Sequence, residues 1–134
     1  MNKRSSLDKL PVNFRHEKDF LIKNNLVSWK LLKSLSDFEI SSFVLTNSLC
    51  TESRFKKIRA IAAFIYHLNL NLHEALLLLH CGVGTIKALS NLEPYILDQK
   101  IGRLERQLNI KIESKLNPNV FKRWIYEARM LINV

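Results

Sequence analysis

Apolar residues recur along this chain at spacings of three and four, and no segment alternates apolar and polar residues for long. A spacing of about 3.6 residues gathers side chains on one helical face, whereas a half-buried strand needs a period of two. Leu and Ile also outnumber Val and Thr, which favours helices. The pattern predicts an all-α fold, a compact helical domain with about eight helices. We expect them near residues 16–23, 28–35, 37–47, 52–67, 71–80, 85–91, 94–108 and 118–131.

Capping chemistry supports several of these boundaries. Ser28 and Thr85 are good N-cap residues, each just before a short amphipathic stretch, and Gly82 is suited to end the helix before Thr85. Pro94 and Pro118 suit the first turn of a helix because their missing N–H would have no intrahelical partner there.

The chain also contains an internal repeat. Residues 20–35 align with residues 77–92, apolar on apolar almost throughout, and residues 55–62 align with residues 121–128 in the same order. Two collinear matches favour duplication of one helical unit. The predicted organisation is one globular domain with the following parts: a partly flexible N-terminal segment (1–15), a first unit (16–67) and a second unit (68–134).

Residues 79–89 resemble a helix-hairpin-helix motif, whose core is Gly-apolar-Gly followed by a small residue four positions on. Gly82, Val83, Gly84 and Ala88 fill these places. Glycines permit positive φ and close backbone approach, which leaves amide groups at the start of the next helix available to a phosphate. The segment is therefore either a phosphate-binding hairpin or a tight connection between two helices.

More broadly, the chain resembles a cyanobacterial and plastid family of uncharacterised proteins with tandem helix-hairpin-helix-like units. The likeness covers about residues 10–132 and is carried by three segments: 74–83, 85–89 and 121–129. The resemblance implies a helical fold with helix-hairpin-helix-like units and a location in the cytoplasm or the plastid stroma. It implies no defined activity. The wider motif class implies nucleic-acid binding.

The first copy departs from the motif. Asn25 and Val27 stand where Gly82 and Gly84 stand in the second copy. Asn tolerates left-handed backbone, but β-branched Val does not, and its side chain would crowd a phosphate. We expect the first hairpin to be structural.

Charge narrows the range of partners. Lys and Arg number 21 against 12 Asp and Glu, giving a formal net charge of +9. This excess favours acidic partners: nucleic acid is the commonest, and an anionic membrane or an acidic protein surface would be attracted by the same charge. The alternative for each basic side chain is an ordinary solvated charge. The candidate nucleic-acid-binding residues are Gly82, Gly84, Thr85, Lys87, Lys30, Lys56, Lys57, Arg59, Lys122 and Arg123.

Catalytic and metal-binding motifs are missing from the sequence. His73 and His80 are seven apart rather than the four that a helical zinc motif needs, and Cys50 and Cys81 lack the further ligands of a metal site. Trp29 and Trp124 occupy apolar positions of the repeat, which favours core packing over base stacking. We expect no enzyme, cofactor or membrane insertion.

Two functional hypotheses follow from the sequence. The first is a soluble, intracellular, non-catalytic protein that binds DNA or structured RNA without sequence preference. The second is a protein-interaction or assembly-factor module for an acidic or nucleoprotein partner.

Overall fold

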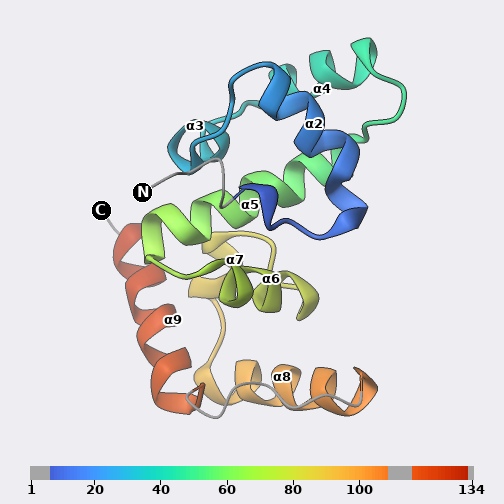
Figure 1. Cartoon of the computed structure of the whole chain (residues 1–134). Coiled ribbons are helices and arrows are strands. Elements are labelled where there is room, and N and C mark those ends of the chain that lie inside the picture. The colour runs from blue at the N-terminus through green and yellow to red at the C-terminus, as the bar shows by residue number, and fades with distance from the viewer. Residues whose placement is uncertain (1–6, 109–115, 133–134) are drawn as a thin grey trace. The chain divides into compact units, whose positions relative to one another are not determined.

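In a computed structural model of the chain, residues 7–108 and 116–132 are described, and within these ranges the chain forms helices and no strands (Figure 1). The all-α prediction is confirmed. A short 3-10 helix, η1 (Val12–Phe14), precedes the α-helices. These are α2 (Arg15–Lys23), α3 (Trp29–Lys33), α4 (Asp37–Thr46), α5 (Glu52–Leu68), α6 (Leu72–His80), α7 (Ile86–Ser90), α8 (Pro94–Leu108) and α9 (Pro118–Ile132).

The predicted helices recur in order, but α3 and α7 are shorter than expected. Their N-caps, Ser28 and Thr85, have extended backbone and lie outside the helices. Their C-caps are Ser34 and Asn91, so each helix has five residues. The prediction had counted the cap residues of both helices as helical, and Leu35 after α3 as well.

The chain divides into two compact units, Met1–Leu72 and His73–Val134. The predicted boundary between residues 67 and 68 stays a prediction, as does the single shared globule. Residues 1–6 of the N-terminal segment lie outside the described part. Farther along this segment Leu7, Leu10 and Phe14 are buried.

In the first unit, α3 packs against α5 (Figure 1). Trp29 and Leu32 of α3 and Phe55, Ile58 and Phe64 of α5 are buried. Apolar spacings of three and four therefore produce a core face on α5, as the sequence predicts.

Glu17 of α2 is fully buried and holds the start of α5. Its Oε2 accepts a hydrogen bond of 2.9 Å from the amide of Thr51, the N-cap of α5, and lies 3.6 Å from Nη1 of Arg54. Its Oε1 has no hydrogen-bond partner among the described residues. A buried carboxylate thus supplies one of the acceptors that the first turn of α5 needs.

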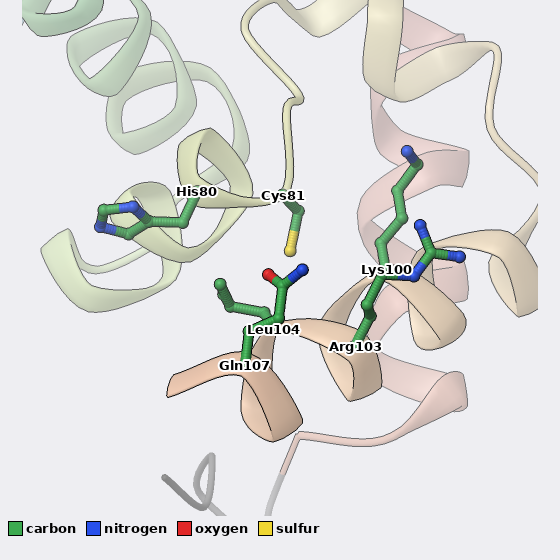
Figure 2. Close-up of a pocket in the computed structure, with 6 residues that line it drawn as sticks. All are labelled: His80, Cys81, Lys100, Arg103, Leu104 and Gln107. Carbon is green, nitrogen blue, oxygen red and sulfur yellow. The ribbon is translucent and has the colours of Figure 1, made fainter. Parts of the chain in front are cut away.

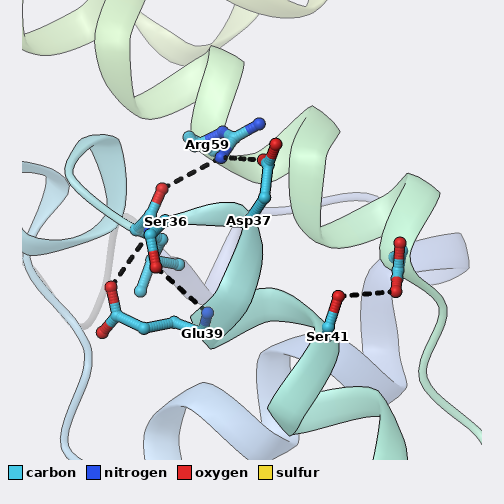
Figure 3. Close-up of polar contacts among 7 residues, drawn as sticks. Ser36, Asp37, Glu39, Ser41 and Arg59 are labelled. Carbon is cyan, nitrogen blue, oxygen red and sulfur yellow. Dashed lines mark hydrogen bonds and ion pairs between the residues drawn. The ribbon is translucent and has the colours of Figure 1, made fainter.

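Arg59 of α5 reaches the segment between α3 and α4 (Figure 3). Its Nη1 donates to the carbonyl of Leu35 and to Oδ1 of Asp37, each at 2.9 Å. The hydrogen bond and positive charge of Arg59 lower the pKa of the Asp37 carboxyl. Beside this contact Ser36 and Glu39 form a reciprocal capping box that starts α4.

In the second unit, α9 packs against α7 and α8. Trp124 is fully buried and Trp29 of the first unit is 8% exposed, which confirms that both tryptophans pack in cores. Arg129 of α9 donates from Nε to the carbonyl of Ser90 at 2.9 Å and from Nη2 to the carbonyl of Leu92 at 3.0 Å. Nη2 also lies 3.7 Å from Oε1 of Glu93.

Candidate nucleic-acid interface

The glycine hairpin of the second unit ends α6 with a Schellman motif. Gly82 has φ +86° and donates its amide to the carbonyl of Leu79 at 3.0 Å, while Val83 donates to Leu78 at 2.9 Å. Val83 is buried beneath the turn, as the motif requires. Local hydrogen bonds within six residues therefore explain why the chain turns at Gly82.

The first hairpin makes the same hydrogen bonds without glycine. Asn25 has φ +60° and donates to Ile22 at 3.1 Å, and Leu26 donates to Leu21 at 2.8 Å. The left-handed backbone that would disfavour a β-branched residue does not occur at position 27. Neither Val27 nor Gly84 has positive φ, so β-branching introduces no left-handed strain there.

The helix that follows each turn starts with an equivalent cap. Ser28 Oγ accepts the amide of Leu31 at 3.1 Å, and Thr85 Oγ1 accepts the amide of Ala88 at 2.9 Å. Thr85 is therefore a capping residue in this structure, and its hydroxyl oxygen is engaged in that role.

The available amides at the second hairpin are fewer than the motif suggests. The amides of Gly82, Val83 and Ala88 are all bonded within the hairpin. The first-turn amides of Ile86 and Lys87 lack intrahelical acceptors. Because α7 has only five residues, its dipole is small, and attraction of an anion must come mainly from side-chain charge.

Gly84 differs from Gly82 in its backbone conformation. A Cβ added to either glycine would meet no atom within 4 Å, but only Gly82 has a left-handed backbone. Both glycines are exposed, as is Lys87 in the first turn of α7. The hairpin therefore presents an unobstructed backbone surface beside one lysine.

This contrast gives a prediction for stability. Replacing Gly82 with Ala is expected to destabilise the second unit by about 1–2 kcal/mol, because an L-residue is strained in left-handed backbone. Gly82→Asn should be milder, since Asn25 holds the corresponding turn. Gly84→Ala should leave stability unchanged or slightly raised. Thermal unfolding measures all three, and equal losses for Gly82→Ala and Gly84→Ala would contradict the assignment.

The predicted basic residues fall into two groups. In the first unit, Lys30 of α3 and Lys56 and Lys57 of α5 are exposed, but Arg59 is half-buried and bonded to Leu35 and Asp37. Arg59 is thus held by the fold. In the second unit Lys122 and Arg123 of α9 are exposed, like Lys87 of α7.

Sequence reasoning missed two cations beside the second hairpin. Lys100 and Arg103 of α8 line a hollow together with His80 and Cys81 of the turn (Figure 2). Their spacing of three on a predicted helix was visible in the sequence. Their position opposite residue 81 was not, because it depends on how α8 packs.

The two thiols of the chain are free and partly or fully buried. Burial raises the pKa of the Cys81 thiol, and nearby Lys100 lowers it by less. Burial also raises the pKa of Cys50, which is 2% exposed. Residues 7–108 and 116–132 contain no group of three or more His, Cys, Asp or Glu that could hold a metal ion.

Comparison with known proteins places the chain in a family. The sequence model of a family described as a domain of unknown function, DUF4332, matches residues 11–131. No curated protein and no solved structure matches the chain significantly. Within the described part of the chain, no helix has the length and apolar character needed to cross a membrane.

Proposed function

We propose that this chain, which belongs to the DUF4332 family, is a non-catalytic protein that binds the phosphate backbone of DNA or structured RNA. The observation that carries the proposal is the exposure of lysine and arginine side chains on α3, α5, α7 and α9, in a chain with a net charge of +9. When exposed cations neutralise backbone phosphates, counterions condensed on the nucleic acid are released, and this release is the main source of non-specific affinity.

The proposal includes no reading of base sequence. Phosphate contacts position a protein on a duplex and carry no direct sequence information, whereas base readout needs side chains that enter a groove. Both tryptophans, the best stacking residues, are buried in the cores. Lys30 and Lys87, on the short, capped helices α3 and α7, suit contacts to the phosphate backbone of the nucleic acid.

The proposal also covers the origin of the two hairpins. Equivalent Schellman bonds and N-caps recur 57 residues apart, and this supports descent from one duplicated helix-hairpin-helix-like unit. A cyanobacterial or plastid habitat, with the protein in the cytoplasm or the stroma, is part of the same proposal.

Lys87→Glu tests the role of the hairpin. The substitution should weaken binding to every duplex alike and reduce the salt slope by about 0.9 log units per log unit of salt for the phosphate lost. An acidic residue in the first turn of α7 is compatible with the helix dipole, so folding should persist. Fluorescence anisotropy with unrelated DNA and RNA duplexes at several salt concentrations measures the effect.

Lys9→Glu is the matched control, because Lys9 is exposed, undergoes the same charge change and lies outside the candidate set. It should weaken binding less than Lys87→Glu. Equal effects would show that net charge, not the hairpin, determines affinity. Failure of the parent chain to bind either duplex at low salt would refute the proposed function.

A protein partner is the second candidate, and one surface favours it. Phe38 and Leu45 of α4 are 81% and 87% exposed and lie seven residues apart, on one face of that helix. Large apolar side chains grouped on a surface are typical of protein contacts. Capture of a protein from a lysate that survives nuclease treatment and is lost in Phe38→Ser/Leu45→Ser would favour this function, whereas recovery of nucleic acid alone would count against it.

A further inference from the structure

A hollow of about 210 Å³ lies between the second hairpin turn and α8 (Figure 2). It is lined by His80, Cys81, Lys100, Arg103, Leu104 and Gln107. This volume is roughly seven times the share of one water in the liquid, so an anionic group fits with part of its hydration.

The side of α8 that lines this hollow carries hydrogen-bond donors and positive charge. Lys100, Arg103 and Gln107 follow at spacings of three and four, and all line the hollow. Asp98 and Glu105 lie on the opposite side of the helix, at about 100° per residue. The lining residues therefore include two cations and no carboxylate.

The turn side of the hollow adds no negative charge. The Sγ of Cys81 points toward Gln107 and Leu104, whereas the ring of His80 points away from α8 (Figure 2). Because burial raises the pKa of Cys81, its thiol stays protonated near neutral pH. An anion entering the hollow thus meets a neutral wall on one side and Lys100 and Arg103 on the other.

A second hollow, of about 420 Å³, adjoins the first through a shared residue. Arg103 lines both, and the second also includes Asp98, Gln99, Gly102 and Arg106. Lys100 and Arg103 both line the first hollow, whereas Arg106 lies about 120° round α8 from Lys100 and lines only the second. The carboxylate of Asp98 in the second hollow would repel an anion, so the first hollow is the more favourable seat for a phosphate.

We infer that the hollow between Cys81 and α8 seats a phosphate of a nucleic-acid backbone, with Lys100 and Arg103 as its charged contacts. This inference rests on the proposed function and names a site for it beside the glycine hairpin. The planar guanidinium of Arg103 can donate two parallel hydrogen bonds to phosphate oxygens, while Lys100 acts as a point charge.

Cys81 offers a direct measure of occupancy. Cys81 is half-buried in the hollow, whereas Cys50 is 2% exposed and serves as an internal control. The full chain is alkylated with iodoacetamide at about pH 8.5, where more of the thiol ionises, and the rate at each cysteine is followed by mass spectrometry. With a DNA or RNA duplex at ten times its dissociation constant, alkylation of Cys81 should slow about tenfold, because about one molecule in eleven stays free.

The double variant Lys100→Gln/Arg103→Gln should lose this protection at the duplex concentration that protects the parent chain, and its salt slope should fall by about 0.9 for each phosphate contact removed. Arg106→Gln is the matched control, since Arg106 is exposed on the same helix and does not line the first hollow. It should retain the protection of Cys81.

The outcomes separate the inference from the proposed function. A duplex that binds without slowing alkylation of Cys81 would overturn the inference and leave the proposed function standing. Protection that persists in the double variant would also overturn it, because the hollow would then be covered without its cations. No binding of either duplex at low salt would remove the proposed function and the inference together.

Discussion

Replacing Glu17 with Ala is expected to lower the free energy of unfolding of the first unit by about 3 kcal/mol. The substitution removes the acceptor of the Thr51 amide at the start of α5 and takes a carboxylate from beside Arg54. A part-buried backbone donor is then left without its partner, and the buried side chain leaves a void. The Arg54 side chain is 38% exposed and can turn toward water. The expected loss of stability is therefore at the lower end of the range for breaking a buried ion pair.

Urea unfolding of the parent chain and three variants measures this effect. Asp19→Ala is the control, since Asp19 is exposed on the same helix and its loss should change stability by about 0.5 kcal/mol or less. Glu17→Gln keeps an acceptor for Thr51 and should lie between the two. If Glu17→Ala and Asp19→Ala were equally stable, the buried contact would have no energetic role.

The second large effect is expected from Arg129→Ala, a loss of about 2 kcal/mol in the second unit. Arg129 joins α9 to the end of α7 through hydrogen bonds to the carbonyls of Ser90 and Leu92. Without it these acceptors lose charged donors, and Ser90 is itself buried. The exposed ion pair with Glu93 should add little, because water screens it.

Two further variants make the Arg129 prediction specific. Arg129→Lys keeps the charge but lacks the planar guanidinium that donates to two carbonyls. We therefore expect it to lose most of the stabilisation that Arg129 provides. Arg123→Ala, at an exposed position on the same helix, should change stability by about 0.5 kcal/mol or less while weakening nucleic-acid binding. Equal thermal unfolding of Arg129→Ala and Arg123→Ala would refute the structural role of Arg129.

The contacts of Arg129 also show a limit of sequence alignment. Residues 55–62 align with residues 121–128, which sets Ile125 opposite Arg59. In the structure Arg59 bonds the carbonyl of Leu35, and the arginine that bonds the corresponding carbonyl, Leu92, is Arg129. Arg129 stands one helical turn beyond the aligned position. The alignment therefore does not identify the residue that makes the corresponding contact.

The sequence by itself determined the helices and their turns. The Schellman bonds at Asn25 and Gly82 and the caps at Ser28 and Thr85 close within six residues, so the residues that specify them are neighbours in the chain. The apolar spacing of three and four residues also accounts for the buried faces of α5 and α9. Interactions of this range leave a direct pattern in the sequence.

Only the tertiary structure decided which charges are available to a partner. Arg59 was a candidate for binding, yet it bonds a carbonyl 24 residues away, and Glu17 is buried by a contact across 34 residues. Lys100 and Arg103 gained their position from the packing of α8 beside the hairpin turn. Charged side chains are long and flexible, and the packing of whole helices determines which groups they reach. The local sequence pattern could therefore locate the hairpins, but it could not identify all the cations that surround them.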